Sequence, residues 1–486
     1  MESLKSPEKQ RYIVAPPLYQ QSSGPTVQAS LRSIHATLQE NIVRSTYETG
    51  PKVLNLSPLE AALVQQRFPS LLVEPDVQYQ LARSPLCPAI EPIQVAASGS
   101  KTVLIQVTGG GHPIPHAQVM VLADLSRNAG YEGLTDENGE LEITVRSSDT
   151  SFPKIMVDPP AGFWSRIWRD VQVGSRLDLE VTPLTIGGFD WGLVDTEAVT
   201  RGQQYGEGVK VAIIDSGIGP HPSLHVAGGH CCILGQEPAD WGDADGHGTH
   251  CAGVVAALDQ AASIWGYAPK VELYALRVFG GPDGGGFASD IRDAIDWAIG
   301  QECDIISMSF ASDTANGYIR GGIEKATDSG VLCIAAAGNQ GGPVQYPAKF
   351  RNVVGVSAVG KVGTFPSDSI HSEAQGSIQS PDRQHFLASF SNHGDEIDVC
   401  APGVAVTSTL PADGFAPWDG TSMACPHVAG IAALALEASQ EIRTAPRDAE
   451  RMGLLLDRVL GICTDLGMSA LYQGSGLPKL SRLFTA

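Results

Sequence analysis

The sequence predicts an α/β protein in three parts: a small α+β unit, a β-sandwich, and a larger domain with a parallel sheet covered by helices on both faces. Between residues 27 and 42, apolar residues recur every three or four positions, which indicates an amphipathic helix. Between residues 103 and 145 they alternate, as in half-buried strands. From about residue 195, continuous apolar strands alternate with helical stretches, which indicates a parallel sheet. We therefore expect domains at residues 1–84, 85–190 and 191–486.

Length and composition agree with several packed domains. The chain has 486 residues, of which 43% are hydrophobic and 17% charged, enough apolar material for about three domain cores. The net charge of −21 gives a surface that repels nucleic acids and anionic membranes, so we expect neither as a partner. An acidic excess of this kind also serves solubility alone.

The cellular location is predicted from the first residues and the cysteines. The start of the chain lacks the apolar stretch of an export signal, and no run of about 18 apolar residues follows. The nine cysteines are odd in number, form no Cys-x-x-Cys pair and in part lie in apolar runs, as expected of free thiols in a reducing compartment. We expect a cytoplasmic protein without a structural zinc site.

The first domain is predicted to alternate strands and helices. Short apolar strands are expected at residues 12–14, 53–56 and 71–73. The first helix carries the apolar stripe Val27, Leu31, Ile34, Leu38 and Ile42. Ser57 can cap a second helix, whose apolar positions are Leu59, Leu63 and Phe68. The order strand, helix, strand, helix, strand is ferredoxin-like in outline.

The second domain shows the two-residue period of a sandwich. Alternating apolar residues are Val103, Ile105 and Val107, then Val119 and Val121, then Leu141, Ile143 and Val145. Asn138-Gly139 is a hairpin signal. The acidic stretch at residues 136–138 lacks the spacing of an EF-hand loop, so we interpret it as a plain turn.

Three polar segments in the third domain carry reactive side chains. A buried strand ends in Asp215, a glycine-flanked helix start carries His247, and another small-residue helix begins at Ser422. At the carboxyl ends of parallel strands such groups can meet. A carboxylate, an imidazole and a serine hydroxyl are the parts of an activated nucleophile.

The order Asp, His, Ser and the surrounding residues resemble the subtilisin-like serine proteases, the subtilase family. The resemblance covers about residues 195–440. It includes Ala-Gly-Asn at 337–339, Tyr-Pro-Ala at 346–348, Ala-Ser-Phe-Ser at 388–391, Asp-Val-Cys-Ala-Pro-Gly at 398–403 and Trp-Asp-Gly-Thr-Ser at 418–422.

The resemblance assigns roles to four residues. It implies that Asp215 orients the imidazole, His247 is the general base and Ser422 is the nucleophile. It implies that the Asn339 side chain and the Ser422 backbone N–H stabilise the oxyanion. His250 and His427 lie in the same motifs, and we expect them to serve packing.

The resemblance also implies where a peptide substrate binds. A substrate-pairing edge is expected at Gly284, Gly285 and Gly286, where glycine lets another backbone approach. The first specificity pocket is expected to involve Ser309, Phe310, Ala311, Ser312, Ala337 and Gly338. Ala311 and Ser312 stand where the common family pattern has two glycines, so we expect a narrowed pocket.

The N-terminal segment resembles the inhibitor-type propeptide that precedes many subtilases, on the residues 12–14, 52–56 and 68–76. This implies that the tail from Val77 to Arg83 lies in the active-site cleft and that the enzyme is latent, with cleavage near Arg83 to Pro85 or displacement as activation. The sandwich between tail and protease departs from the family pattern, and a transthyretin-like module is one candidate for it.

No organic cofactor and no catalytic metal are expected. The family's calcium loop matches residues 258–264, with Gln260 as a candidate ligand. The carboxylate that the family contributes after its His-Pro pair is replaced by Ser223. Because calcium prefers charged oxygen ligands, we expect it to bind weakly or not at all.

The sequence thus predicts a serine endopeptidase that acts on proteins or peptides through an acyl-enzyme and is inhibited by its own N-terminal domain. Three alternatives stay open: a catalytically silent binding module, a peptide ligase or macrocyclase with the same triad, and a processing protease with one dedicated protein substrate. None of the four catalytic residues is absent, which disfavours the binding module.

Overall fold

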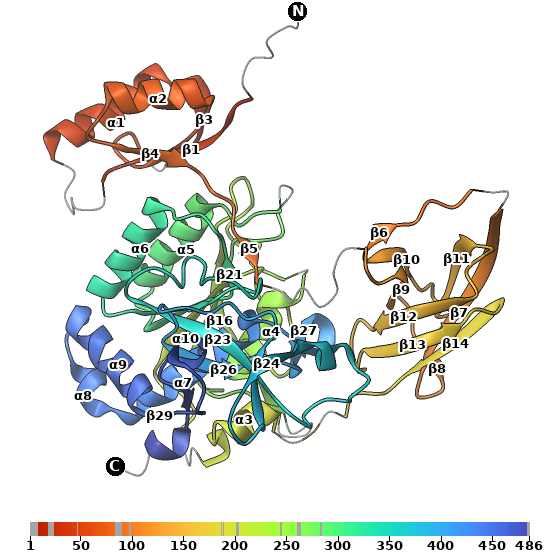
Figure 1. Cartoon of the computed structure of the whole chain (residues 1–486). Coiled ribbons are helices and arrows are strands. Elements are labelled where there is room, and N and C mark those ends of the chain that lie inside the picture. The colour runs from red at the N-terminus through yellow and green to blue at the C-terminus, as the bar shows by residue number, and fades with distance from the viewer. Residues whose placement is uncertain are drawn as a thin grey trace, which may run out of the picture.

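The computed structural model describes residues 8–17, 24–45, 47–82, 90–96, 99–185, 187, 189–200, 204–243, 245–259, 264–281 and 284–483. Figure 1 shows a central body, an N-terminal unit above it and a sandwich to one side. Strand β5 descends from the N-terminal unit onto the body beside β21.

The N-terminal unit is a four-stranded antiparallel sheet with two helices. The strands are β1 (Gln10–Ala15), β2 (Ile42–Ser45), β3 (Lys52–Leu56) and β4 (Leu72–Pro75), in the order β2-β3-β1-β4. The helices are α1 (Pro25–Thr37), the short η1 (Gln39–Asn41) and α2 (Pro58–Arg67). The sequence prediction missed β2, so the order is strand, helix, two strands, helix, strand.

Two helix details of the prediction are wrong. Ile42 does not continue the stripe of α1, because the helix ends at Thr37 and Ile42 opens β2. In α2 the leucines point outward: Leu59 is 66% and Leu63 53% exposed, whereas Ala61 and Val64 are buried. Periodicity finds the faces of a helix but cannot choose the inner one when both carry apolar residues. The cap at Ser57 forms, as a reciprocal capping box with Glu60.

The second part is a sandwich of two sheets. One has the order β13-β12-β9-β10-β6 and the other β11-β7-β14, with β8 paired to β7. The strands are β6 (Glu91–Pro92), β7 (Ser100–Gly109), β8 (His112–Pro113), β9 (Gln118–Asp124), β10 (Ala129–Leu134), β11 (Glu140–Arg146), β12 (Ser151–Asp158), β13 (Arg166–Gln172) and β14 (Arg176–Val181). The alternating residues of β7, β9 and β11 fill the space between the sheets.

The hairpin predicted at Asn138-Gly139 is wrong. This turn joins β10 to β11, which belong to different sheets, so it carries the chain across the sandwich. Gly139 has φ 72°, a conformation that favours glycine, and the Asp136 carboxylate accepts the backbone N–H groups of Asn138 and Glu140. The turn signal was sound, but a turn alone does not say whether its strands pair.

The central body is a largely parallel sheet between helices, which confirms the predicted α/β class. The sheet order is β16-β19-β15-β20-β22-β23-β25-β24, and β26 also pairs with β23. Its strands are β15 (Lys210–Asp215), β16 (Val226–Cys231), β19 (Glu272–Arg277), β20 (Ile305–Met308), β22 (Leu332–Ala336), β23 (Val353–Lys361), β24 (Gln375–Gln379), β25 (His385–Ala388) and β26 (Val399–Pro402).

Helices cover the sheet on both faces. The long ones are α4 (His247–Ala256), α5 (Ala288–Gly300), α6 (Gly317–Asp328), α7 (Thr421–Ala438) and α9 (Ala449–Gly461). In β15, Ile213 packs in the core with α4 and α7, whereas its neighbour Ile214 packs in the core with α5 and α6. Successive strand residues point to opposite faces, so each face has its own core.

Shorter elements complete the body. They are α3 (Trp191–Asp195), η3 (Ala198–Thr200), β17 (Leu258–Asp259), β18 (Ile264–Trp265), β21 (Phe310–Ala311), η4 (Ile370–Ala374), β27 (Val406–Leu410), η5 (Pro411–Asp413), β28 (Gly414–Trp418), α8 (Gln440–Thr444), β29 (Cys463–Thr464), α10 (Ala470–Gln473), β30 (Leu477–Pro478) and η6 (Leu480–Leu483).

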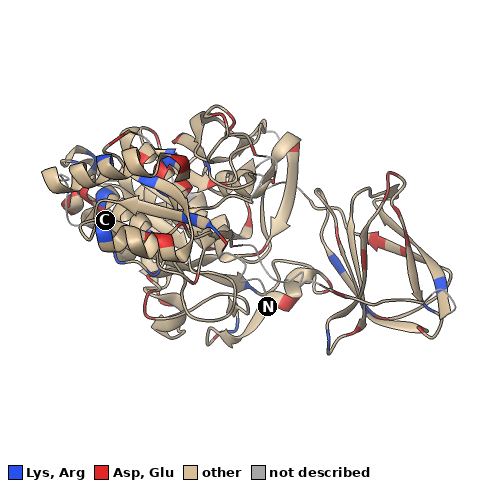
Figure 2. Ribbon diagram, turned by 90° about the horizontal axis from the view of Figure 1, so that it is seen from above, with Lys and Arg blue, Asp and Glu red and all other residues tan. Residues whose placement is uncertain are grey.

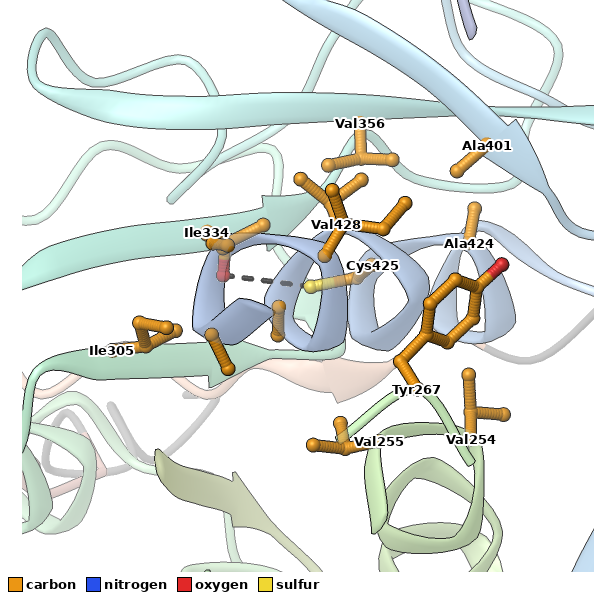
Figure 3. Close-up of a cluster of buried hydrophobic side chains, with 14 of the residues drawn as sticks. Val254, Val255, Tyr267, Ile305, Ile334, Val356, Ala401, Ala424, Cys425 and Val428 are labelled. Carbon is orange, nitrogen blue, oxygen red and sulfur yellow. Dashed lines mark hydrogen bonds between the residues drawn. The ribbon is translucent and has the colours of Figure 1, made fainter. Parts of the chain in front are cut away.

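Helix α7 lies at the centre of the larger core. Its residues are buried on all sides over most of its length, as expected of a helix that is apolar all round. Figure 3 shows Ala424, Cys425 and Val428 of α7 among Ile305, Ile334 and Val356 of the sheet. The Cys425 thiol donates to the Ile334 carbonyl at 3.5 Å. A helix fixed in this way gives its first residues, Thr421 and Ser422, a rigid position.

The charged residues are distributed over the molecule, and the described cysteines are free thiols. Acidic and basic residues lie scattered over the parts of the chain drawn in Figure 2. The net charge of the whole sequence is −21. Eight cysteines of the described chain are free, and all of them except Cys463 are buried; Cys87 lies outside the described residues. In the described part of the chain, every helix is too short or too polar to cross a membrane.

Candidate active site

Four of the predicted residues meet at one edge of the sheet. Asp215 is the last residue of β15, His247 and Ser422 lie in the first turns of α4 and α7, and Asn339 follows β22. Gly246, with φ 96°, turns the chain into α4. A Cβ on Gly248 would lie 2.1 Å from the Gly217 carbonyl oxygen, so only glycine allows this approach of α4 to the turn after β15.

Asp215 and His247 form a buried pair. His247 Nδ1 lies 2.7 Å from Asp215 Oδ1, and neither side chain is exposed. Asp215 Oδ1 also accepts the Ser216 backbone N–H at 2.8 Å. A carboxylate as acceptor requires that Nδ1 carries the proton, which leaves Nε2 as the basic nitrogen.

A second carboxylate holds the start of α4. Asp243 accepts the backbone N–H groups of Gly246 and Thr249, each at 2.9 Å, and the Thr249 hydroxyl at 2.6 Å. Burial raises the pKa of Asp243, against the effect of the Thr249 and Gly246 hydrogen bonds. This ring of contacts fixes the helix turn that carries His247.

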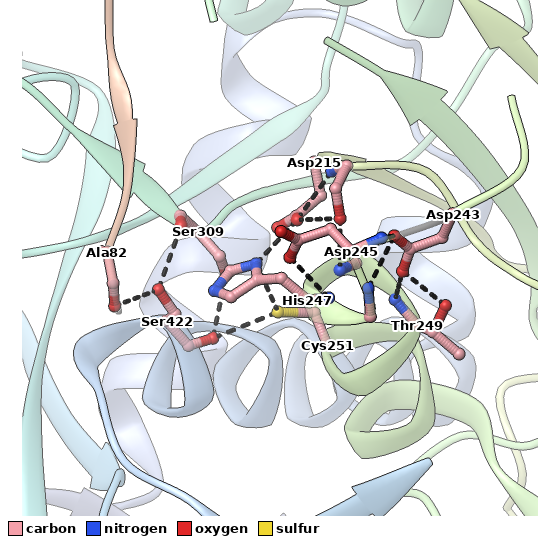
Figure 4. Close-up of polar contacts among 12 residues, drawn as sticks. Ala82, Asp215, Asp243, Asp245, His247, Thr249, Cys251, Ser309 and Ser422 are labelled. Atoms are coloured by element: carbon pink, nitrogen blue, oxygen red, sulfur yellow. Dashed lines mark hydrogen bonds and ion pairs between the residues drawn. The ribbon is translucent and has the colours of Figure 1, made fainter. Parts of the chain in front are cut away.

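The Ser422 hydroxyl is not hydrogen-bonded to the imidazole. Figure 4 shows the His247 ring between Asp215 and Ser422. The Ser422 hydroxyl, however, donates to the Ala82 carbonyl at 2.5 Å and has Ser309 O at 3.0 Å. Among the described residues, His247 Nε2 has no hydrogen-bond partner. The acceptor for the Ser422 proton is therefore present but not engaged while Ala82 occupies the site.

Asn339 is oriented for an oxyanion. Its Oδ1 accepts the Thr421 backbone N–H at 2.9 Å and the Thr421 hydroxyl at 2.8 Å. These two bonds turn Nδ2 toward the Ala82 carbonyl oxygen, to which it donates. A fixed amide donor and a serine hydroxyl around one carbonyl can stabilise the negative charge of acyl transfer.

This geometry agrees with a comparison to known families. Residues 206–455 match the subtilase family. The chain belongs to the subtilase family.

Three curated relatives of this subtilase are proteases of bacilli and similar bacteria. Subtilisin Savinase of Lederbergia lenta is 35% identical over 290 residues, which are 59% of this chain and 95% of the relative. Subtilisin of Bacillus pumilus is 38% identical over 278 residues, 56% of this chain and 89% of the relative. M-protease of Shouchella clausii is 35% identical over 303 residues, 62% of this chain and 70% of the relative. The predicted resemblance is confirmed, and the protein is a subtilisin-like serine endopeptidase that acts on proteins or peptides.

The tail of the N-terminal unit of this subtilase runs along the predicted substrate edges and ends beside Ser422. Strand β5 (Gln80–Leu81) pairs antiparallel with β21, and Ala82 N donates to Ser309 O at 3.1 Å. On the other side, Tyr79 N donates to Gly286 O at 2.7 Å, and Gln78 bridges to Phe287. The tail is thus a strand between two edges, as in peptide recognition by strand addition.

The predicted substrate residues surround this tail. Of the three glycines, Gly286 bonds the tail backbone and Gly285 O accepts the Gln78 amide, while Gly284 lies against the Gln78 side chain. Phe310 and Ala311 pair with the tail, and Ser309 bonds Ala82 and Ser422. Ser312 is instead engaged with Tyr346, and Ala337 and Gly338 precede Asn339, where Gly338 N donates to the Thr421 hydroxyl.

Tyr79 is the main apolar anchor of the tail. It is 1% exposed and packs edge-on against Phe310, with ring centroids 5.8 Å apart. Burial raises the pKa of its hydroxyl well above the ordinary value, so the phenol stays neutral. A side chain of this size contributes much of the free energy that keeps the tail in place.

Two acidic residues of the N-terminal unit, which the sequence analysis did not single out, bind helix starts of the body. Glu74 accepts the backbone N–H groups of Gly317 and Tyr318 at 2.9 and 2.7 Å at the start of α6. Asp76 accepts Ser289 N and its hydroxyl, both at 2.9 Å, at the start of α5. Carboxylates are favoured at helix N-termini. Their partners lie more than 200 positions away, and no local pattern points to them.

The other candidates have packing roles. His250 Nε2 lies 3.1 Å from the carbonyls of Val406 and Ala416, and burial lowers its pKa to about 3. His427 Nδ1 contacts Met423 O at 2.7 Å, and burial lowers its pKa to about 4. Both rings therefore stay neutral at physiological pH. Cys251 Sγ lies 4.0 Å from His247 Nδ1, with a pKa that burial raises well above the ordinary value.

The described residues give little support for a calcium ion. Gln260 and its neighbours to residue 263 lie outside the described residues. Ser223 is buried, and its carbonyl accepts Leu258 N at 2.8 Å. An uncharged hydroxyl at this position is a poor replacement for a carboxylate ligand.

Proposed function

We propose that this subtilase exists first as a latent endopeptidase whose residues 8–82 block the cleft until the chain is cut after Ala82 or the N-terminal unit is displaced. One observation carries the proposal. The Ala82 carbonyl oxygen accepts hydrogen bonds from both Ser422 Oγ and Asn339 Nδ2, so the tail places a carbonyl group between the proposed nucleophile and the proposed oxyanion donor.

The same four side chains supply the chemistry. His247 Nε2 takes the proton of Ser422 as Oγ attacks the carbonyl carbon, and Asp215 stabilises the imidazolium. Asn339 Nδ2 and the Ser422 backbone N–H hold the oxyanion. His247 then gives its proton to the leaving amine, an acyl-enzyme remains, and water releases the acid. Before attack, Oγ must leave the Ala82 carbonyl oxygen and turn to Nε2.

Tethering explains why the tail blocks the enzyme. A tail on the same chain is present at an effective concentration of about 1 mM, so modest affinity keeps the cleft filled. Here the strand pairing, the buried Tyr79 and the two helix-start carboxylates act together. Because the Ala82 carbonyl contacts Ser422 and Asn339, we expect cleavage after Ala82; residues 83–89 lie outside the described residues.

A single change in the tail tests latency. Tyr79→Ala removes the buried ring, and loss of a buried aromatic side chain costs about 3–5 kcal/mol. We expect the full chain with Tyr79→Ala to hydrolyse a small peptide substrate at least tenfold faster in the first minutes than the wild type. Leu59→Ala, an exposed leucine of the same unit, is the control and leaves the rate unchanged. Equal rates for wild type and Tyr79→Ala would refute latency.

Sequencing of new N-termini tests the cleavage. We expect incubated full-length protein to yield a fragment beginning at Arg83, and Ser422→Ala to yield none. A fragment that begins elsewhere, or that forms equally in Ser422→Ala, contradicts cleavage of the aligned bond. The masses of products from one synthetic peptide separate hydrolysis from transfer to an amine, because water and amine add different masses.

A further inference from the structure

A second buried histidine–aspartate pair lies behind the turn that carries the nucleophile. His371 Nδ1 donates to Asp419 Oδ1 at 2.8 Å, and the two residues are 4% and 8% exposed. Neither side chain touches the peptide in the cleft in any described contact. The triad chemistry does not use this pair, so its burial needs another explanation.

Asp419 anchors the turn before Ser422. Its Oδ1 also accepts Ala405 N at 2.6 Å, which ties the turn to the loop after β26. The next residue, Gly420, lies so close to the cleft that an added Cβ would be 2.8 Å from the Ala82 carbonyl oxygen. Thr421 then orients Asn339. A shift of Asp419 would therefore move the nucleophile and the amide donor together.

His371 is held in turn by the β-sandwich. Its ring meets the Trp164 ring edge-on, with centroids 5.6 Å apart. The backbone around it bonds the sandwich as well: Ile167 N donates to Asp368 O at 2.6 Å, and Ile370 N donates to Ser165 Oγ at 3.3 Å.

Ion pairs flank this contact. Glu373 pairs with Lys154 at 2.5 Å and with Arg169 at 3.0 Å. Asp368 pairs with Arg166 at 2.8 Å. Ion pairs with the sandwich therefore hold residues 368–373 on both sides of His371.

A sandwich carboxyl lies within electrostatic range of the pair. Burial raises the pKa of Asp158 to about 6, while the nearby His371 lowers it and Asp419 raises it. Asp158 is the last residue of β12, so a charged group of the sandwich lies within electrostatic range of both partners.

We propose that His371 is a positioning residue of this peptidase: it holds Asp419 and thereby the turn with Ser422, and the sandwich holds His371. The sandwich is then part of the working enzyme and not only a spacer between tail and protease. The inference rests on the endopeptidase activity and is independent of latency.

The experiment separates positioning from folding. All variants are made in the full chain with Tyr79→Ala, which opens the cleft, and kcat is referred to active sites counted with a fluorophosphonate. We expect His371→Ala to lower kcat about 10- to 100-fold, the effect of losing a hydrogen bond to a charged group, with KM changed by less than about threefold. His371→Asn, which keeps an N–H donor close to the Nδ1 position, should restore most of kcat.

His385→Ala is the matched control. It breaks another buried pair, His385 Nε2 to Asp195 Oδ2 at 2.8 Å, away from the nucleophile turn. We expect it to lower the melting temperature and leave kcat per active site unchanged. If His371→Ala behaves like His385→Ala, or if His371→Asn restores nothing, the positioning role is wrong.

A double-mutant cycle tests the part played by the sandwich. Trp164→Ala should lower kcat and, combined with His371→Ala, should add less than its separate effect, because both changes release the same contact. Fully additive effects would show that the sandwich does not act through His371. The hydrolysis rate of the parent chain with Tyr79→Ala alone is measured before that of any His371 variant. If this parent chain hydrolyses no peptide, the endopeptidase assignment itself is refuted.

Discussion

At the scale of single residues, Asn339 shows how one side chain links the backbone to the chemistry. Thr421 bonds its side-chain oxygen, and its amide nitrogen is thereby directed at the Ala82 carbonyl oxygen. We expect Asn339→Ala to lower kcat by about 100- to 1000-fold, as for the loss of one oxyanion donor. Ser422→Ala should abolish hydrolysis and leave the fold intact. Steady-state kinetics measure the effect of Asn339→Ala on kcat. Fluorophosphonate labelling that survives Ser422→Ala would contradict the assignment of Ser422 as the nucleophile.

The first specificity pocket is also decided by single residues. Ala311 is 8% exposed and pairs with the tail, and Ala82, the residue before the aligned bond, is 6% exposed. We expect peptides with Ala, Val or Leu before the cut bond to be hydrolysed faster than those with Phe or Tyr, because each poorly fitting methylene costs about 1–3 kcal/mol.

A variant that enlarges the pocket makes this specificity prediction sharper. Ala311→Gly combined with Ser312→Gly should raise the ratio of kcat/KM for Phe over Ala by about tenfold or more. Matched peptides that differ only at this position give the ratio. A wild-type preference for Phe, or an unchanged ratio in the double variant, would count against a narrowed pocket.

At the scale of elements, the N-terminal sheet is fixed to the body through helix starts. Asp76 bonds Ser289 at the start of α5, and Arg11 pairs with Asp76 at 2.8 Å. Asp76→Asn removes the charge that the helix start attracts, and hydrogen bonds to charged groups contribute about 1.5–3 kcal/mol. We expect the full chain with Asp76→Asn to show about tenfold more initial peptidase activity. Glu40→Gln, an exposed acid in the same unit, should show no change.

The elements that could be predicted were those with a local signal. The strand ending in Asp215, the helix start at His247 and the alternating strands of the sandwich follow from period and composition. Strand β2 has four residues, one of them Arg44, and it exists because it pairs with β3. The inward face of α2 was misassigned because the sheet beneath it selects Ala61 and Val64.

The active site followed the same rule. Its four predicted residues lie in family motifs, and the structure brings them together at one edge of the sheet. The pair His371 and Asp419 joins segments 48 positions apart, and His371 lies in no recognisable pattern. Its function depends on a contact with the sandwich, which no sequence period encodes.

At the scale of the whole molecule, Asp195 joins distant parts of the body. Lys361 bonds its Oδ1 at 2.5 Å and His385 its Oδ2 at 2.8 Å, and Lys479 near the end of the chain approaches it at 4.0 Å. Burial would raise the pKa of Asp195, but the bonds from His385 and Lys361 prevail and lower it to about 2.

The lowered pKa of Asp195 makes the free energy of unfolding depend on pH in the acid range. Because the folded pKa lies below the unfolded one, the ionised carboxylate contributes about 2 kcal/mol above pH 4, and the contribution is lost as the pH falls toward 2. Urea unfolding in the Ser422→Ala chain, which cannot digest itself, measures it. Asp195→Asn should cost about 2 kcal/mol at pH 7 and much less at pH 2, whereas Asp170→Asn, at an exposed site, should cost little at either. An equal cost at both pH values would contradict the assignment.

Under the proposed latency, the position of Ala82 also determines the kinetic order of activation. While the bond after Ala82 is intact, leaving and refilling the cleft are events within one molecule, and the active fraction is the same in dilute and concentrated solution. Once that bond is cut, the N-terminal unit is a second molecule, and refilling becomes bimolecular. Dilution alone would then release the enzyme, and crowding would hold it back. The cut would thus determine when activity begins, and the concentration of the two separated pieces would determine how fast activity rises.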